Sequence, residues 1–140
     1  MKIILTILFS IAGLNLTYTQ KKSPLDGNWL LVEKNGRKLN FQNHQFKSYH
    51  QGYFSVIILK NDGTFNSAYA GPFSINGQVY TETYKYGSKP EWFGWTADQE
   101  WTLKGDTLHM IGHTRIVDPE GKEHPKTEWG QFVEKWVRAR

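Results

Sequence analysis

Residues 25–36, LDGNWLLVEKNG, decide the fold. Trp29 stands two residues after Gly27 on a short apolar run, and the run ends in the dipeptide Asn35-Gly36. Asn-Gly supplies the positive φ angles that a two-residue hairpin turn requires. The stretch therefore predicts a β-strand followed by a hairpin. It leaves two alternatives open: the first strand of a plain small β protein, or the opening strand of a barrel built around a ligand.

The first nineteen residues have the pattern of a secretory signal peptide. Lys2 supplies a positive charge, residues 3–16 are apolar, and Thr17 and Thr19 are the small residues before the expected cleavage site. The apolar run is too short and too interrupted to serve as a stable membrane anchor. We expect cleavage after Thr19, a periplasmic or secreted location, and a single domain over residues 20–140.

The composition of residues 20–140 bounds the class of protein. The whole chain has no cysteine, so no disulfide framework supports this exported domain, which must fold on its hydrophobic core. The formal net charge of +4 falls to +3 without Lys2, and the basic residues are scattered rather than interleaved with aromatic residues in one block. Nucleic acid is therefore excluded as an expected partner.

Aromatic side chains are unusually frequent. The sequence has 6 Trp, 7 Tyr and 8 Phe, and only Phe9 and Tyr18 fall in the expected signal peptide. Such an inventory fits an aromatic β core, and a cavity lined by rings is the alternative. Composition alone favours the aromatic core.

Past residue 25 the sequence alternates short β-rich runs with turn dipeptides and shows almost no helical periodicity. The turn signals recur about every 12 residues, which fits about eight to ten strands. Strands joined by tight turns are antiparallel neighbours. Such a meander has two exposed edges unless its last strand pairs with its first. We therefore predict an all-β fold, an up-and-down antiparallel β-barrel.

Five short motifs, taken in order, resemble the lipocalin-like (calycin-type) small β-barrel domains of bacterial secreted proteins. They are LDGNW at residues 25–29, NDGTF at 61–65, YTE at 80–82, GDTL at 105–108 and WVR at 136–138. The resemblance implies a lipocalin-like barrel in which Trp29 closes one end and Trp136 lies on the closing strand. The chain is shorter than a typical lipocalin, so a barrel filled by its own side chains stays open as the alternative to a ligand cavity.

Two irregular stretches interrupt the strand pattern. Residues 42–52 are polar and are expected to form a loop or a single helical turn. Residues 87–98 contain Pro90 and Gly94 together with Trp92 and Trp95. The tight turns leave no room for a mouth, so we predict that residues 46–53 and the Trp92–Trp95 loop border the open end.

The side chains predicted to bind a ligand point toward this end. Strand alternation puts Tyr80, Glu82 and Tyr84 on one face, and bulky rings suit the interior of a barrel. The alternative places these tyrosines outside and Val79 within. A buried carboxylate is costly unless it is paired, and Arg138 is the predicted partner of Glu82. The predicted ligand is a small apolar or aromatic molecule, with no cofactor. The predicted ligand-binding residues are Tyr69, Tyr80, Glu82, Tyr84, Trp92, Trp95, Trp101 and Arg138.

Other kinds of site receive less support from the sequence. His109 and His113 would lie about 13 Å apart on a strand, so we predict surface histidines and no metal site. The chain has no Gly-rich phosphate loop, no G-x-S-x-G and no Cys, so no catalytic residue is predicted. Two alternatives to a ligand carrier remain: a glycan- or protein-binding surface that uses Trp92 and Trp95, and a small barrel enzyme with Glu82 as acid or base.

Overall fold

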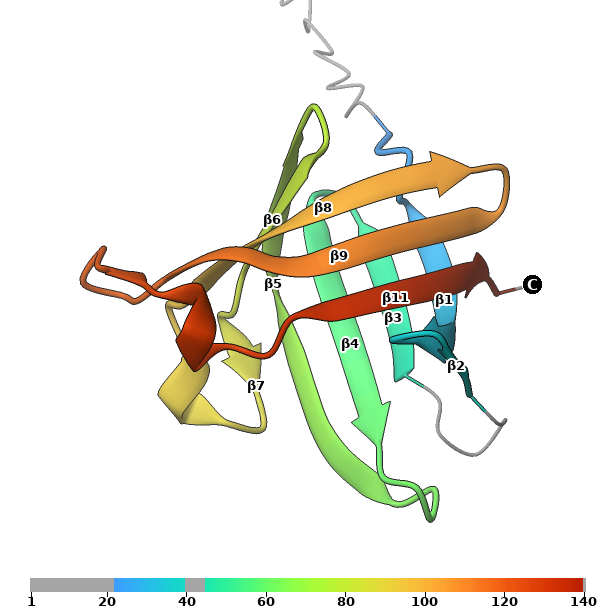
Figure 1. Ribbon diagram of the computed structural model, residues 1–140, viewed down its shortest axis with the longest axis horizontal. Helices are drawn as coiled ribbons and strands as arrows, with labels where there is room; N and C mark the ends of the chain where they lie inside the picture. Colours follow the sequence, from blue (N-terminus) through green and yellow to red (C-terminus); the bar gives the residue numbers. More distant parts are fainter. Residues whose placement is uncertain (1–21, 40–44, 140) are drawn as a thin grey trace, which may run out of the picture.

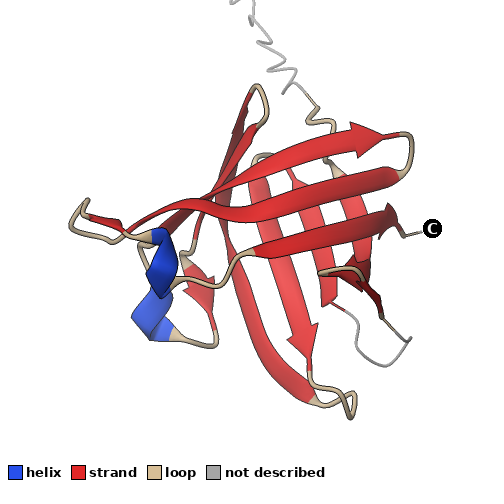
Figure 2. Ribbon diagram, in the orientation of Figure 1, coloured by secondary structure: helices blue, strands red, loops and turns tan. Residues whose placement is uncertain are grey.

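The structure is a computed structural model that describes residues 22–39 and 45–139, and in these residues the chain forms a single antiparallel β-barrel (Figures 1 and 2). The predicted signal peptide lies outside the described residues. The barrel wall consists of β1 (Gly27–Lys34), β3 (Gln45–His50), β4 (Tyr53–Leu59), β5 (Phe65–Asn76), β6 (Val79–Thr83), β8 (Thr96–Lys104), β9 (Thr107–Val117) and β11 (Phe132–Arg138). The shorter elements are β2 (Arg37–Lys38), β7 (Tyr86–Gly87), β10 (Glu123–His124) and the 3₁₀ turns η1 (Pro90–Trp92) and η2 (Lys126–Glu128).

The barrel is closed. Each wall strand pairs with two others in the order β1-β3-β4-β5-β6-β8-β9-β11, and β11 returns to pair with β1, so that Trp29 stands opposite Arg138. Every one of these pairings is antiparallel. Closure removes the two edges that an open meander would expose. The predicted up-and-down barrel is confirmed, with eight wall strands in the described residues.

The hairpin that the opening stretch predicts is present. Lys34 on β1 pairs with Arg37 on β2, and the two turn residues Asn35 and Gly36 have φ angles of 51° and 75°. Two consecutive positive φ angles define the turn that matches the twist of a two-residue hairpin. Asn tolerates this region and Gly has no Cβ to oppose it, which is why this dipeptide stands here.

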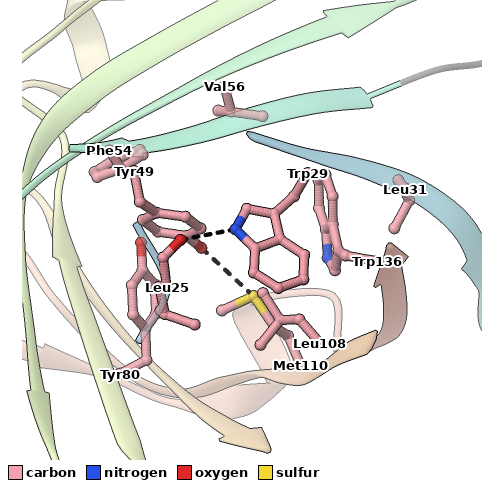
Figure 3. Packing of buried hydrophobic residues seen from close by; sticks show 10 residues of the cluster. All are labelled: Leu25, Trp29, Leu31, Tyr49, Phe54, Val56, Tyr80, Leu108, Met110 and Trp136. Atoms are coloured by element: carbon pink, nitrogen blue, oxygen red, sulfur yellow. Dashed lines mark hydrogen bonds between the residues drawn. The ribbon is translucent and has the colours of Figure 1, made fainter. Parts of the chain in front are cut away.

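The closed end of the barrel is packed around Trp29 (Figure 3). The Trp29 side chain is fully buried, and its indole N–H donates a hydrogen bond of 2.8 Å to the Leu25 carbonyl oxygen. Tyr49 donates from its hydroxyl to the sulfur of Met110 in the same cluster, at 3.8 Å. Trp136, on the closing strand, is also buried. Both tryptophans therefore belong to the buried cluster of the barrel.

Residues 45–50, within the stretch 42–52, do not form the predicted loop or helical turn. Residues 45–50 form strand β3, which pairs with β1 and β4, and Tyr49 stands opposite Gly27 at the closed end. Lys47 and Tyr49 point inward and Ser48 does not, so the strand alternates as a barrel wall should. The inward lysine hides this alternation in the sequence. Residues 40–44 lie outside the described part.

The opposite end of the barrel is where β6 and β9 end and β8 and β11 begin. Residues 84–95, which contain β7 and η1, and residues 118–131, which contain β10 and η2, lie side by side here (Figure 1). Of the two segments predicted to border the open end, the Trp92–Trp95 loop does lie there. Residues 46–53 instead run to the closed end. The second border is the 118–131 segment. No helix in the described ranges is long and apolar enough to cross a membrane.

Candidate functional site

The open end contains a pocket of about 260 Å³, here called the outer pocket. Its floor comes from strands β5 and β9 and its cover from the two irregular segments, so residues distant in the sequence meet around it. Six of its eight lining residues are aromatic rings, counting the imidazole of His113. The lining residues are Tyr69, Tyr84, Lys89, Trp92, Trp95, His113, Ile116 and Trp129.

Three tryptophans form one wall of the outer pocket. The ring centroids of Trp92 and Trp129 are 4.7 Å apart, those of Trp95 and Trp129 are 5.2 Å apart, and those of Trp92 and Trp95 are 5.5 Å apart. All three pairs are edge-to-face, the arrangement that aromatic quadrupoles favour. The wall therefore joins the two irregular segments through ring contacts.

His124 packs against this wall of tryptophans. Its imidazole lies 4.9 Å from the Trp95 ring, its Nε2 is 2.8 Å from a carboxylate oxygen of Asp118, and its Nδ1 is 3.2 Å from one of Glu128. The hydrogen bonds to Asp118 and Glu128 raise the pKa of His124 above its ordinary value. The hydrogen bond from His124 lowers the pKa of Asp118. The segment that carries Trp129 is thus held by a charge-assisted clamp.

A second cavity, here called the inner cavity, lies deeper in the barrel and has a volume of about 220 Å³. It shares Tyr69, Tyr84 and His113 with the outer pocket, so these three side chains lie between the two spaces. Unlike the outer pocket, it is lined by carboxylate and amide side chains as well as apolar ones. The other lining residues are Lys34, Gln45, Lys47, Val56, Ile58, Glu82, Gln99, Phe132, Glu134 and Trp136.

Glu82 is the centre of a buried hydrogen-bond network in the inner cavity. Lys47 Nζ donates to its Oε2 at 2.8 Å, the Tyr80 hydroxyl donates to the same oxygen at 2.7 Å, and the Tyr84 hydroxyl donates to Oε1 at 2.7 Å. Burial alone would raise the pKa of Glu82, but the charge of Lys47 and the three hydrogen bonds lower it overall. Burial works against the charge of Lys47 as well, yet Glu82 raises the pKa of that lysine. Both groups are therefore ionised.

A second ion pair, between neighbouring residues of β1 and β11, lines the same cavity. Lys34 Nζ donates to Glu134 Oε1 at 2.8 Å, and the Trp136 indole N–H donates to Glu134 Oε2 at 3.2 Å. The four charged side chains that line the inner cavity thus form two pairs of opposite sign. The cavity carries hydrogen-bonding groups but no net charge.

The predicted Glu82–Arg138 pair is wrong. The partner of Glu82 is Lys47, and Arg138 lies at the closed end, where its guanidinium carbon is 4.3 Å from the centroid of the Trp29 ring. Arg138 donates to the backbone oxygen of Asp26 at 2.8 Å. Antiparallel pairing with β1 fixes this position, because Arg138 stands opposite Trp29. Arg138 lines neither the outer pocket nor the inner cavity.

The remaining predicted ligand-binding residues divide into two groups. Tyr69, Glu82, Tyr84, Trp92 and Trp95 line one or both of the two cavities. Tyr80 and Trp101 line neither: Tyr80 is fully buried as a donor to Glu82, and the Trp101 indole donates to the Gly77 carbonyl oxygen in the hairpin at the closed end. The predicted place of these two side chains at the mouth is therefore wrong, although the strand that carries Tyr80 alternates as expected.

Among the lining residues that were not predicted are Lys47, Gln99, His113 and Trp129. Lys47 and Gln99 are polar residues at inward positions of strands, which binary patterning reads as exposed. Trp129 belongs to a loop turn that the sequence merges with the last strand. Alternation along the 96–104 strand, where Ala97 and Gln99 both face inward, is the one signal that would have identified Gln99.

His113 departs from the prediction of surface histidines. The β8–β9 ladder has an irregularity at which Asp98 pairs with Arg115 but Gln99 pairs with Gly112, so His113 and Thr114 bulge out of register. The His113 ring packs edge-to-face on Phe132 at 5.0 Å and lines both cavities. Burial lowers the pKa of His113, so its imidazole is neutral at pH 7. No cluster of three metal-ligating residues occurs within residues 22–39 and 45–139.

Two polar atoms in the wall of the outer pocket have unused hydrogen-bonding capacity. His113 Nδ1 and Trp129 Nε1 are buried and have no hydrogen-bond partner among the described residues. A buried polar atom without a hydrogen bond costs about 1–3 kcal/mol, so native proteins contain few of them. A ligand in the outer pocket could provide the missing hydrogen bonds.

Comparisons with known proteins support the fold. No protein-family model matches the chain, and no curated protein matches it. Among solved structures the chain is similar to a lipocalin-like protein from Bacteroides uniformis, with a TM-score of 0.50 and 19% identity over 82% of this chain and 98% of that one. A structure described as the REP1-NXSQ fatty acid transporter has a TM-score of 0.37 and 12% identity over 83% and 96% of the two chains. The chain therefore has a lipocalin-like barrel fold, as its motifs predicted.

Proposed function

We propose that this protein is an exported binding protein that holds a small apolar or aromatic molecule in the mouth of its barrel. The observation that carries the proposal is the outer pocket, a space of about 260 Å³ walled by three tryptophans and two tyrosines. Rings of this kind favour flat apolar ligands, which they contact by stacking and edge-to-face packing.

The two cavities suit a single elongated ligand. Drug-sized ligands occupy pockets of about 300–1,000 Å³, and each of the two spaces is smaller than this range. They share Tyr69, Tyr84 and His113 as lining residues. A rotation of these side chains would join the spaces, so that the ligand's apolar body lies among the tryptophans and its inner end lies among the polar groups.

The alternative of Glu82 as a catalytic acid or base has less support. Its two carboxylate oxygens already accept three hydrogen bonds, and its lowered pKa leaves no proton to donate at pH 7. A general acid needs a raised pKa instead. The glycan-binding alternative is likewise weaker, because Trp92 and Trp95 pack on each other and on Trp129 rather than presenting a free stacking platform.

The proposal is tested by native mass spectrometry of the protein purified from its own host. We expect a fraction with added mass from a small molecule that organic solvent releases. The double variant Trp92→Ala/Trp129→Ala should lose that fraction, whereas the matched control Trp101→Ala, at the closed end, should retain it. Equal retention by both variants, or apo protein that binds no aromatic probe, would contradict the proposal.

Export is tested separately. The pattern of residues 1–19 supports cleavage by a signal peptidase. The intact mass of the host protein should correspond to a chain that begins at residue 20, recovered from the periplasm or the medium. A full-length chain recovered from the cytoplasm would contradict this part of the proposal.

A further inference from the structure

We propose that the ligand's inner end is an uncharged group that both donates and accepts a hydrogen bond, such as an amide, and that the Gln99 side chain recognises it. The inference rests on the proposed function and deepens it, because it adds the chemical class of the ligand: a flat, uncharged aromatic compound with an amide-like end.

The charges of the inner cavity exclude an ionic ligand end. Lys47 is paired with Glu82 and Lys34 with Glu134, so no lining charge is left to neutralise a carboxylate or an ammonium group. His113 faces the same space as a neutral imidazole. Lys89, on the outer pocket, is exposed, so water and salt screen its charge. An ion that entered the inner cavity would therefore be desolvated without a counter-charge.

Gln99 is the most deeply buried of the polar side chains in the inner cavity that make no hydrogen bond within the described part of the protein. Gln99 lies on strand β8, is 2% exposed and lines the inner cavity. None of the hydrogen bonds among the described residues involves its side-chain amide. By contrast, the neighbouring Glu82 accepts three hydrogen bonds and Glu134 accepts two.

A buried primary amide without partners is costly to a fold, and an apolar residue of similar size would be the more stable choice. Its two N–H donors and one carbonyl acceptor match another amide in a planar, paired arrangement. A ligand amide would satisfy these groups without adding charge to the cavity. The unused nitrogens of His113 and Trp129 in the adjoining wall are a second sign that this region is incomplete without a partner.

Four probes that share one ring system separate the possibilities: 2-naphthamide, 2-naphthoate, 2-naphthylmethylammonium and naphthalene. Their dissociation constants are measured at pH 7 by quenching of tryptophan fluorescence, for the wild type and for Gln99→Leu. The matched control is Gln78→Leu, at an exposed glutamine in the turn between β5 and β6. Urea unfolding of each variant reports whether it is folded.

We expect 2-naphthamide to bind about tenfold or more tightly than either charged probe, as the desolvation of an unpaired ion requires. Gln99→Leu should weaken 2-naphthamide about five- to tenfold, the value of one or two uncharged hydrogen bonds, and change naphthalene by less than about twofold. The same variant should unfold at an equal or higher urea concentration, which a purely structural role of Gln99 would not allow. Gln78→Leu should change none of these values.

Tighter binding of a charged probe, or an equal effect of Gln99→Leu on all four probes, would overturn this inference and leave the proposed function standing. Gln99→Met serves as a second variant, and it should reproduce the selective loss of 2-naphthamide binding. Absence of binding for all four probes, together with host-purified protein that carries no small molecule, would contradict the proposed function and this inference with it.

Discussion

Replacement of Lys47 by Met tests the buried network that underlies the inner cavity. The side chains of Lys47 and Glu82 are 7% and 5% exposed and their charged atoms are 2.8 Å apart. Removal of one partner from a buried ion pair costs about 3–5 kcal/mol, because the other charge is left uncompensated. Glu82 keeps its hydrogen bonds from Tyr80 and Tyr84 in this variant. We therefore expect a loss near the lower limit, about 3 kcal/mol at pH 7.

The double variant Lys47→Met/Glu82→Gln is the matched control. It removes both charges and keeps the shape of the cavity, so its free energy of unfolding should lie within about 1 kcal/mol of the wild type. Glu82→Gln alone leaves Lys47 unpaired, but the rings of Tyr49, Phe54 and Tyr80 lie 5.0 to 5.5 Å from its ammonium group. These cation–π contacts make the loss smaller than that of Lys47→Met.

The free energies of unfolding of the wild type and of Lys47→Met should depend on pH in opposite directions. In the wild type the folded-state pKa of Glu82 is lowered, so its contribution to stability is present above the unfolded pKa and is lost as pH falls through the folded value. In Lys47→Met burial acts on Glu82 without a counter-charge, so the pKa rises and acid restores stability. The gap between wild type and variant, measured by urea unfolding, should narrow from pH 7 to pH 4. Equal stability of the single and double variants at pH 7, or a gap that does not change with pH, would refute this reasoning.

Three further predictions concern the closed end, the clamp and the first hairpin. Trp29→Ala should lower the free energy of unfolding by about 3–5 kcal/mol, since the ring is fully enclosed, and a change below that of Trp101→Ala would place the ring outside the core. In an NMR titration His124 should titrate above and His113 below the ordinary histidine pKa, and the reverse order would contradict the clamp. Because the pKa of His124 is raised, the stability that the clamp contributes is present below the unfolded histidine pKa, while Asp118 and Glu128 are ionised, and is lost as pH rises through the folded pKa of His124. Gly36→Val should cost about 1–2 kcal/mol because φ is 75° at that position, whereas Gly130→Val, at a glycine without positive φ, should cost less.

Local sequence patterns are enough to predict the first turn, the strand alternation and the closure of this barrel. The Asn35-Gly36 turn follows from the φ angles that the dipeptide allows, and alternation along one strand places Tyr80, Glu82 and Tyr84 on a common face. Closure follows from the cost of exposed edges. These features depend on neighbours in the chain or on a general property of sheets, so no knowledge of strand register is needed.

The side chains that line the two cavities could not be predicted in the same way, because they depend on strand register and on polar residues that break the hydrophobic–polar pattern. Lys47 meets Glu82 only because β3 and β6 face each other across the barrel, a relation that no sequence spacing records. His113 reaches the interior through a ladder irregularity, and Trp129 reaches the pocket through the fold of a loop. Buried polar residues such as Gln99 violate binary patterning, and such violations concentrate at functional sites.

Indole N–H resonances provide the most direct measurement of the central claim, that the barrel mouth binds an aromatic ligand. Trp92, Trp95 and Trp129 wall the outer pocket, whereas Trp29 is enclosed at the closed end. Titration with the tightest-binding of the four naphthalene probes should shift the indole signals of the three pocket tryptophans, with saturation at one equivalent, and leave that of Trp29 unchanged. Saturable shifts confined to Trp29 or Trp101, or no saturable shift at all, would contradict the account.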